Sequence, residues 1–374
     1  AEVVSRMELD LARSLGVPFE NVIFNGPHKP PDALEPVLAA GGTVNIDHTD
    51  EIGDLERVAE MLGRPVKVGL RLNLDAGIYP QWTRFGFNLE NGQALDAVKR
   101  LSKSRRLVLS GLHCHLGTFI SDPRAYGRQV EKMVRFGLEL EASFGLHMEF
   151  YDVGGGFASR NQLKGTYLPP DVAVPPIDEY AEQITDALWR NLPPGSFPKL
   201  IVESGRALVD EAGSLITTVW AVKRLADGTR AYVADAGVNL LFTSFWYRFA
   251  VALDRPAAGP NEPCVIYGPL CMNIDVLHDL AMLPPLSRGT RLIFSPVGAY
   301  NTTQWLQFIE YRPRVVLIGE DGSVDVIRES ESLEDVFRQD RLPSRLAPRA
   351  TASPPARTVS KRAEHLARAS TKRE

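Results

Sequence analysis

Two histidines near the middle of the chain are the first residues whose type and spacing indicate chemistry. The segment His113-Cys114-His115-Leu116-Gly117-Thr118 ends a run of β-forming residues, and on a strand the side chains of His113 and His115 would face the same side. Such a pair can bind a metal ion. It can also place one imidazole over a flat ligand, or hydrogen-bond inside a core. The motif alone leaves these three interpretations open.

A glycine triplet follows the next run of β-forming residues. In Asp152-Val153-Gly154-Gly155-Gly156-Phe157, three glycines let the backbone turn so that several N–H groups point the same way. A turn of this kind binds anions, and phosphate in particular. The alternative is a tight turn with no ligand.

A carboxylate and a guanidinium lie close together in Glu203-Ser204-Gly205-Arg206. If this segment ends a strand, Glu203 points into the mouth of the fold, Gly205 permits a close backbone approach, and Arg206 offers a fork that matches phosphate. The alternative is an ion pair between Glu203 and Arg206 at the surface.

Two motifs in the second half carry a thiol and a phenol. Cys271 lies in Gly268-Pro269-Leu270-Cys271-Met272-Asn273-Ile274-Asp275, and Tyr300 ends Pro296-Val297-Gly298-Ala299-Tyr300. A cysteine is most often a buried structural thiol, and the tyrosine could simply pack. Neither motif is decisive alone.

The elements that must position these residues alternate between strands and helices. Amphipathic stretches such as Asp50–Leu62 separate seven strand candidates, and this alternation is typical of a parallel sheet. A closed barrel of this type needs eight strands. We therefore expect either an open doubly wound sheet or a barrel whose first strand lies upstream of Ala1. The seven candidates are Glu2–Ser5, Asn21–Phe24, Thr43–Asp47, Val66–Asn73, Leu107–His115, Met148–Val153 and Leu200–Glu203.

The pattern changes after Arg206, where glycine and proline punctuate strands without regular helices between them. We predict a barrel domain over 1–212 and a mostly antiparallel β domain over 213–340, with a short helix at Leu333–Arg338. Residues 341–374 hold nine Lys or Arg and two Glu, and we expect them to form a disordered basic tail. The strand candidates of the β domain are Ala207–Val222, Arg230–Asp235, Cys264–Tyr267, Arg291–Phe294 and Arg314–Ile318.

The composition of the 374 residues excludes several classes of protein. The net charge of −4 gives no general case for nucleic-acid binding. No uninterrupted apolar run is long enough to span a membrane. Cys114, Cys264 and Cys271 are too few for a disulfide framework, so we expect a reducing, cytoplasmic location.

Taken in order, the motifs resemble the fold type III decarboxylases that use pyridoxal 5′-phosphate, the family of diaminopimelate, ornithine and arginine decarboxylases. The resemblance implies an α/β fold, with a (β/α)₈ TIM-type barrel whose first strand is missing from the chain, followed by a mostly antiparallel β domain. It rests on Val4–Glu8, Val22–Lys29, His113–Thr118, Asp152–Phe157, Glu203–Arg206, Asp235–Gly237, Gly268–Asp275 and Gly298–Tyr300.

The resemblance also implies roles for individual residues. His115 would stack on the pyridine ring, and Arg71 would support the surroundings of the ring. Glu203 would bind the pyridine nitrogen and keep it protonated, so that the ring stabilises the carbanion left by loss of CO₂. The phosphate would be held by Thr118, Gly154, Gly155, Gly156, Gly205, Arg206 and Tyr300.

Within this family the active site is shared across a two-fold homodimer. The resemblance implies that Cys271 arrives from the partner subunit and returns a proton to the substrate carbon. Arg84 matches a basic position of the subunit interface, and we predict that it meets Asp275 of the other subunit.

The chain departs from the family pattern at the lysine that carries the cofactor, whose position falls upstream of Ala1. The missing strand and the missing lysine would share one lost segment, which favours an N-terminally truncated sequence. A non-catalytic homologue that binds a partner is the alternative. A metal-dependent hydrolase built on His113 and His115 lacks further ligands at later strand ends.

Two substrate positions also differ. Thr243 stands where diaminopimelate decarboxylases usually have an arginine, and Met272 replaces the acid that usually follows the catalytic cysteine. Together with Gln304 and Arg312, they indicate a small-molecule substrate that is a bulky acidic amino-acid conjugate. The alternative for Gln304 and Arg312 is packing within the β domain or contact across the dimer. The segment Tyr300–Pro313 resembles the branch that decarboxylates carboxylate-siderophore intermediates. The alternative is an enzyme like diaminopimelate decarboxylase, acting in amino-acid biosynthesis.

Overall fold

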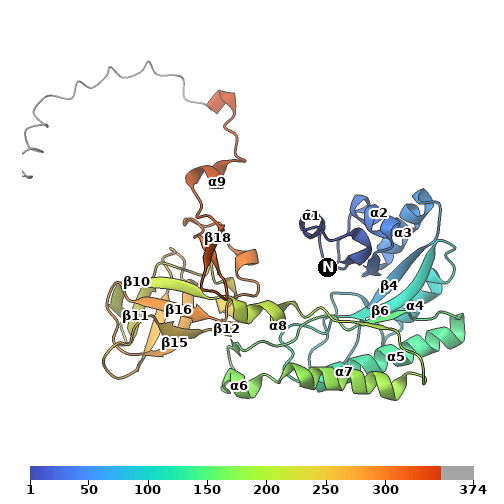
Figure 1. The fold of residues 1–374 in the computed structure, drawn as a ribbon, viewed down its shortest axis with the longest axis horizontal. Coiled ribbons are helices and arrows are strands. Elements are labelled where there is room, and N and C mark those ends of the chain that lie inside the picture. The colour runs from blue at the N-terminus through green and yellow to red at the C-terminus, as the bar shows by residue number, and fades with distance from the viewer. Residues whose placement is uncertain (347–374) are drawn as a thin grey trace, which may run out of the picture. The chain divides into compact units, whose positions relative to one another are not determined.

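The computed structural model describes residues 1–346. Two compact units make up this part of the chain, one spanning Ala1–Phe308 and the other beginning at Ile309. The first unit holds both a mainly parallel sheet and a mainly antiparallel sheet (Figure 1).

The parallel sheet follows the order of the chain. Each strand pairs with the next along the sequence, and the additional short strand β5 (Phe87–Asn88) pairs with β4. The seven predicted strands are confirmed, with shorter bounds at several ends. They are β1 (Glu2–Val3), β2 (Ile23–Phe24), β3 (Thr43–Ile46), β4 (Val66–Asn73), β6 (Leu107–Cys114), β7 (Phe150–Asp152) and β9 (Lys199–Ile201).

This sequential order decides between the two expected architectures. A doubly wound sheet reverses its strand order at a switch point, and no such reversal is present among the described strands. The sheet is curled, and the hydrogen bond from Asn25 after β2 to Glu203 after β9 shows that the ends of these two distant strands lie close together. The barrel prediction is therefore confirmed. The described strands β1 and β9 are the two ends of the order, and they do not pair with each other.

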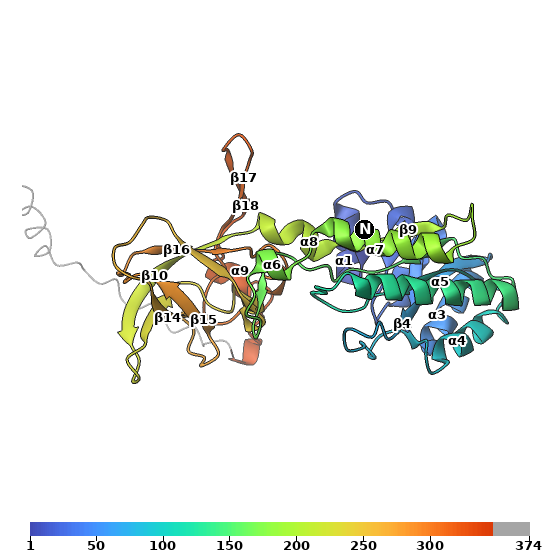
Figure 2. The ribbon, with the colours of Figure 1, turned by 90° about the horizontal axis from the view of Figure 1, so that it is seen from below.

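Helices cover the outer face of the parallel sheet, while β4 and β6 are buried along almost their whole length. In α3 the apolar residues Ile52, Leu55 and Val58 are buried, as the predicted amphipathic pattern requires. Figures 1 and 2 show α5 and α7 side by side. The helices are α1 (Arg6–Ser14), α2 (Pro31–Ala40), α3 (Thr49–Met61), α4 (Gln93–Leu101), α5 (Arg124–Phe144), α6 (Pro170–Ala173), α7 (Ile177–Asn191) and α8 (Gly205–Val209).

The β domain is a six-stranded sheet in the order β13-β16-β10-β11-β14-β15. Its pairs are antiparallel apart from β11 with β14, so the mostly antiparallel prediction is confirmed. A two-residue strand, β12, joins it to the loops above the barrel by pairing with β8. The bounds are β8 (Gln162–Leu163), β10 (Leu215–Arg224), β11 (Arg230–Ala234), β12 (Tyr247–Arg248), β13 (Ala250–Leu253), β14 (Glu262–Tyr267), β15 (Val276–Leu283) and β16 (Arg291–Ser295).

One strand prediction in this region is confirmed only in its second half. The sequence pattern predicts a strand over Ala207–Val222, and β10 covers this range from Leu215 onward, but residues from Gly205 to Val209 form helix α8. A short 3₁₀ turn at Asp210–Ala212 separates the two elements, and the carbonyl of Asp210 accepts the N–H of Gly298. The β-forming residues Val209 and Leu208 therefore belong to a helical connection rather than to the sheet.

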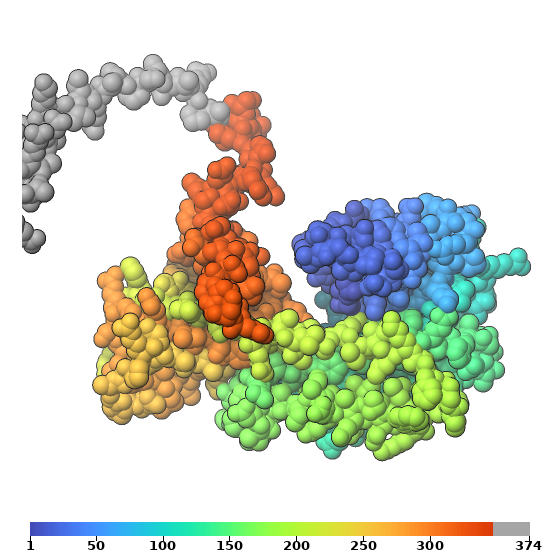
Figure 3. All heavy atoms as spheres, in the orientation of Figure 1, coloured from blue at the N-terminus to red at the C-terminus, as the bar shows by residue number. Residues whose placement is uncertain are grey.

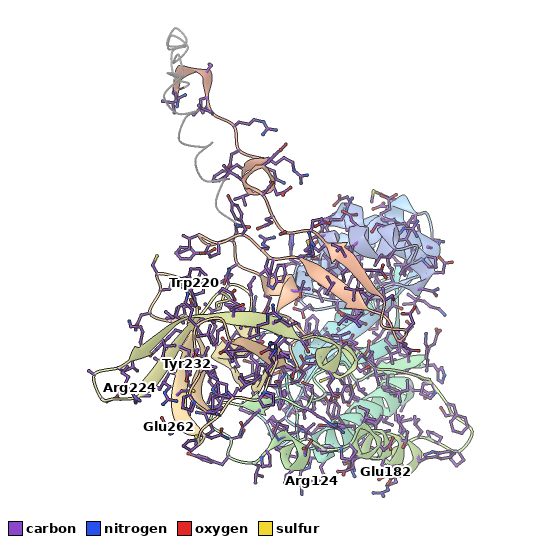
Figure 4. The ribbon with its side chains drawn as sticks, turned by 60° about the vertical axis from the view of Figure 1, so that its left-hand side comes forward. Arg124, Glu182, Trp220, Arg224, Tyr232 and Glu262 are labelled. Atoms are coloured by element: carbon purple, nitrogen blue, oxygen red, sulfur yellow. The ribbon has the colours of Figure 1, made fainter. Side chains whose placement is uncertain are left out.

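Aromatic and aliphatic side chains fill the interior of the β domain. Tyr232, Phe249 and Phe294 are fully buried, and the hydroxyl of Tyr232 accepts the N–H of Leu286 at 3.0 Å. Trp220 lies on the exposed face of β10, where the guanidinium of Arg288 lies 4.3 Å from the centre of its ring. Figure 4 labels Tyr232 and Trp220, which belong to these two faces.

The second unit contains a hairpin and a short helix. Strands β17 (Val315–Ile318) and β18 (Val324–Arg328) are antiparallel, and α9 (Leu333–Phe337) begins after a Ser332 capping box. The predicted strand at Arg314–Ile318 and the predicted helix at Leu333–Arg338 are confirmed. The predicted domain 213–340 differs from the structural division, which falls at Ile309.

The predicted disordered tail, 341–374, lies mostly outside the described residues, which end at position 346. The helices of the described part of the chain do not combine the length and apolar character needed to cross a membrane.

Candidate active site

A cavity of about 1080 Å³ opens at the carboxyl ends of the parallel strands. In Figure 3 the N-terminal residues (blue) and the segment around α8 (yellow-green) border this hollow. Its lining brings together most of the residues predicted from the sequence. They are Arg71, Arg84, His115, Thr118, Gly156, Glu203, Gly205, Arg206, Thr243, Tyr300 and Gln304.

Glu203 lies at the base of the cavity, directly after β9. Its main-chain N–H donates to the carbonyl of Gly154 at 2.8 Å. Its Oε1 accepts a hydrogen bond of 2.6 Å from Asn25 Nδ2 and lies 3.3 Å from Nε2 of His113. Burial alone would raise the pKa of this carboxyl, but the charge of His113 and the contacts with both histidines outweigh it. The pKa therefore lies well below its ordinary value, and Glu203 is a carboxylate.

His115 is held by the glycine turn. Its Nδ1 accepts the main-chain N–H of Gly155 at 3.0 Å, which leaves the ring proton on Nε2. The indole of Trp82 lies 5.7 Å from the imidazole, centre to centre. About a quarter of the His115 side chain is exposed to the cavity. The hydrogen bond from Gly155 fixes the orientation of the His115 ring, and part of the ring is exposed to the cavity. This geometry favours the interpretation in which the imidazole faces a flat ligand.

The glycine triplet is required by its surroundings. Gly154 and Gly156 have positive φ angles of 69° and 91°, which side chains rarely adopt. A Cβ atom on Gly155 would lie 2.2 Å from the carbonyl oxygen of Glu203, and one on Gly156 would lie 2.2 Å from that of Gly117. Gly205 differs, since a Cβ atom there would meet no atom within 4 Å. Main-chain oxygens therefore pack closely against the glycine triplet, whereas space remains beside Gly205.

Arg206 is a fixed cation beside this turn. Its guanidinium lies 4.9 Å from the ring centres of both Tyr247 and Tyr300, and 3.6 Å from the carboxylate of Asp210. Asp210 is itself buried and accepts hydrogen bonds from Ser159, Asn161 and the N–H of Ala299. The two rings and the carboxylate hold the guanidinium in place at the cavity wall.

Arg71 reaches the cavity from β4. Its guanidinium lies 3.4 Å from Asp47 and 4.6 Å from the centre of the Phe85 ring. Arg84 lies 5.0 Å from the same ring. The loop between β4 and β5 thus adds an aromatic ring and a second guanidinium to the lining of the cavity.

Sequence reasoning missed the residues that lie behind Glu203. Asn25 bridges Glu203 and Glu2, and Asn45 donates to the side-chain oxygen of Asn25. His113 and Asp152 are almost fully buried next to Glu203. Period-two alternation places His113 on the same side as His115, and Asp152 opens the glycine motif, so both signals were present in the sequence.

Cys271, Met272 and Arg312 do not line the cavity, and Thr243 lines it with its hydroxyl already bonded. Cys271 is exposed, and neither Cys271 nor Met272 lines the site of its own chain. Thr243 lines the cavity, but its hydroxyl donates to Asn301 at 2.9 Å. Arg312 belongs to the second unit, where its guanidinium lies 3.5 Å from Glu331.

The structure corrects the expected setting of Asp275. It is 2% exposed, and its two carboxylate oxygens accept the main-chain N–H groups of Val238 and Leu270 at 2.7 Å. These bonds hold together two loops of its own chain. Asp275 is therefore an internal residue rather than one presented at the surface, and its pairing with Arg84 of another subunit stays a prediction.

These residues fit a phosphorylated pyridine. A buried carboxylate suits a protonated ring nitrogen, an imidazole stands beside it, and a glycine turn with a fixed guanidinium and a tyrosine suits a phosphate. A curled parallel sheet with this set of groups at its carboxyl edge defines a barrel that binds pyridoxal phosphate.

Comparison with known proteins agrees with this class. The family model described as "Pyridoxal-dependent decarboxylase, pyridoxal binding domain" matches residues 1–210. The diaminopimelate decarboxylase of Archaeoglobus fulgidus is 32% identical over 356 residues, covering 92% of this chain and 82% of its own. That of Actinosynnema pretiosum is 34% identical over 360 residues, covering 91% and 77%. The chain belongs to the pyridoxal-dependent decarboxylase family.

Solved structures give the same result. The diaminopimelate decarboxylase of M. jannaschii, determined with L-lysine, superposes with a TM-score of 0.82 at 27% identity, covering 92% of this chain and 80% of that one. The enzyme of Helicobacter pylori, also determined with L-lysine, gives a TM-score of 0.78 at 27% identity, covering 90% and 83%. The family identifies the cofactor as pyridoxal 5′-phosphate and the class of enzyme as a carboxy-lyase.

Proposed function

We propose that this decarboxylase acts on diaminopimelate or a closely related diamino acid. The observation that carries the proposal is the ionised Glu203 at the base of the cavity, beside a turn and a guanidinium suited to phosphate. The relatives described above are named diaminopimelate decarboxylases, and the two solved structures that share its fold contain L-lysine.

Different residues of this chain would bind different parts of the cofactor. Glu203 would keep a proton on the pyridine nitrogen, and when the cofactor is bound its ring draws electrons from the substrate carbon that loses CO₂. His115, fixed by the N–H of Gly155, would cover one face of the ring. Gly156, Gly205 and Arg206 would hold the phosphate, with Tyr300 beside them.

A second copy of the chain would complete the site. Cys271 is exposed and lies outside the cavity of its own chain, which supports a two-fold dimer in which it serves the partner's cavity. Mixing the inactive variants Glu203→Gln and Cys271→Ala should then restore activity. Random exchange gives half mixed dimers with one intact site, so about a quarter of wild-type CO₂ release is expected. No recovery after verified subunit exchange would contradict the shared site.

One observation favours a second candidate substrate. Thr243 stands at the position expected to bind a distal carboxylate, but it carries no charge and its hydroxyl is bonded to Asn301. Gln304 lines the same cavity. Thr243 thus gives the distal carboxylate of diaminopimelate no counter-charge, while the guanidinium of Arg84 lines the same cavity and would suit an amino acid linked to citrate or 2-oxoglutarate, of the carboxylate-siderophore type.

The test compares the two substrates with protein produced from its complete gene and loaded with cofactor. We expect CO₂ release from diaminopimelate with a higher kcat/KM than from a citrate-linked amino acid. The reverse order would establish the second candidate. A visible absorption band of bound cofactor without CO₂ release from either substrate would indicate a non-catalytic homologue.

A further inference from the structure

Two buried side chains lie next to Glu203, and of these His113 borders the cavity while Asp152 does not. His113, on β6, is 1% exposed, and Asp152, on β7, is 0% exposed. One side-chain atom from each of His113, Asp152 and Glu203 lies within 4.8 Å of the other two. Residues buried this deeply are normally uncharged and apolar, so a cluster of three titratable groups here calls for a physical reason.

The hydrogen bonds of this cluster are incomplete. Asp152 Oδ1 accepts the N–H of Gly154 at 3.0 Å, but Oδ2 has no hydrogen-bond partner among the described residues. His113 Nε2 lies 3.3 Å from Glu203 Oε1, yet the two are not aligned for a hydrogen bond, and Nδ1 has no partner among residues 1–346. Charge rather than hydrogen bonding therefore holds the imidazole against the carboxylate.

The charges around His113 come from each strand that faces it. Glu203 and Asp152 are acidic, Glu2 lies on the far side of Asn25, and Arg71 on β4 supplies a positive charge that is committed to Asp47. Two buried carboxyl groups beside a single imidazole favour its cationic form. Burial lowers the pKa of His113, but Glu203 and Asp152 outweigh burial, so the pKa is raised.

We propose that His113 is a positioning residue, whose cationic imidazole keeps Glu203 ionised and aimed at the nitrogen of a bound pyridine ring, with Asp152 supporting that imidazole from behind. This inference rests on the proposed function, since it assigns Glu203 to the ring nitrogen. An unpaired buried carboxylate is costly, and loss of its partner favours protonation instead. A protonated Glu203 would no longer favour a charged pyridinium.

The experiment measures recognition of the ring nitrogen without any reaction. Isothermal titration calorimetry compares pyridoxamine 5′-phosphate with its 1-deaza analogue, in which carbon replaces the ring nitrogen. We expect wild-type protein to prefer the pyridine by about 10- to 100-fold, as for a hydrogen bond between charged groups. His113→Gln should lose most of this preference, and Glu203→Gln all of it. Asp152→Asn should lose less than His113→Gln.

A matched control variant is available in the β domain. His278 is 8% exposed and lies on β15, away from the cavity, so His278→Gln removes a buried imidazole without touching the site. It should keep the wild-type preference. If His113→Gln also keeps it, the positioning role is wrong while the proposed function stands. If wild-type protein shows no preference, the assignment of Glu203 to the ring nitrogen fails first.

A second measurement reads the protonation state in wild-type protein, and variants serve only to assign the signal. In ¹⁵N NMR of histidine-labelled wild-type protein, the His113 side chain should carry two ring protons at pH 7.5, where an unperturbed imidazole is neutral. The cationic signal is assigned by its loss in His113→Asn and its persistence in His278→Gln. A neutral His113 ring at this pH would overturn the proposal even if the affinities changed.

Discussion

The interior of the curled parallel sheet and the interior of the β domain differ in the kind of side chains that they bury. Behind the barrel cavity lie buried carboxyl, imidazole and amide groups, and some of their atoms have no hydrogen-bond partner among the described residues. The β domain buries Tyr232, Phe249 and Phe294, and His278 there is kept neutral because burial lowers its pKa to about 4. One interior stabilises the fold by packing, and the other holds charge for chemistry.

The comparison teaches where each kind of substitution acts. Buried charge is costly to the folded state, so it persists where a ligand benefits from it. Tyr232, Phe249 and Phe294 of the β domain do not line the cavity, and close packing of such side chains contributes stability rather than ligand binding. The effects of substitution should therefore separate cleanly between stability and activity.

The largest expected effect is on stability, from a substitution in the β domain. Phe294→Ala removes a fully buried ring on β16 and should lower the free energy of unfolding by about 3–5 kcal/mol. Chemical denaturation followed by circular dichroism measures it. The ring nitrogen preference of the surviving folded fraction should be unchanged, and a loss of that preference would show that the two interiors are coupled.

The next effect is on activity, from the barrel. Glu203→Gln replaces a carboxylate that is placed to stabilise charge, and we expect kcat for CO₂ release to fall by about 10²–10³-fold. The variant should stay folded, because Asn25 and the Gly154 carbonyl still have partners, although the free energy of unfolding falls since His113 loses its carboxylate neighbour. A variant that unfolds instead would assign Glu203 a structural role. His278→Gln serves as the control with unchanged kcat.

The smallest expected effect is on how the stability of the folded protein depends on pH. Burial, opposed by the charge of His113, raises the pKa of Asp152 from 3.8 to about 7. A raised carboxyl pKa means that the folded protein holds a proton that the unfolded chain releases. This stabilisation is complete below about pH 4 and is lost as the pH rises through 7.

His278 should act in the other direction. Its pKa falls from 6.5 to about 4, so its contribution is complete above pH 6.5 and is lost as the pH falls toward 4. Melting temperatures measured between pH 4.5 and 8 should therefore show a smaller alkaline decline in Asp152→Asn and a smaller acid decline in His278→Gln. Parallel profiles for wild type and both variants would contradict this assignment.

Much of the architecture could be predicted because it depends on local patterns. Alternating strands and helices fix a parallel sheet, and motifs at strand ends fix which side chains meet at its carboxyl edge. Arg71, His115 and Glu203 meet there as expected. The short strands of the β domain were harder, because β13 has only four residues and β15 includes His278 and Asp279.

Two properties of individual side chains could not be predicted: how deeply a side chain is buried beneath the cavity, and in which direction it points. Period-two alternation gives the side of a strand but not how far a residue lies beneath the cavity, so His113 and His115 look equivalent in the sequence. Asp275 follows Cys271 closely, yet its oxygens turn inward to main-chain N–H groups. Such hydrogen bonds depend on residues 238 and 270, which only the folded chain brings together.

The indole of Trp82 lines the cavity and lies 5.7 Å from the ring of His115. A chromophore that absorbs near-ultraviolet light and is seated against His115 would take up excitation energy from this indole. Occupancy of the cavity can therefore be read as a loss of tryptophan emission, without a label. Trp246 lines the same cavity, so Trp82→Phe should remove the part of that signal that comes from the indole beside His115 while keeping an aromatic wall.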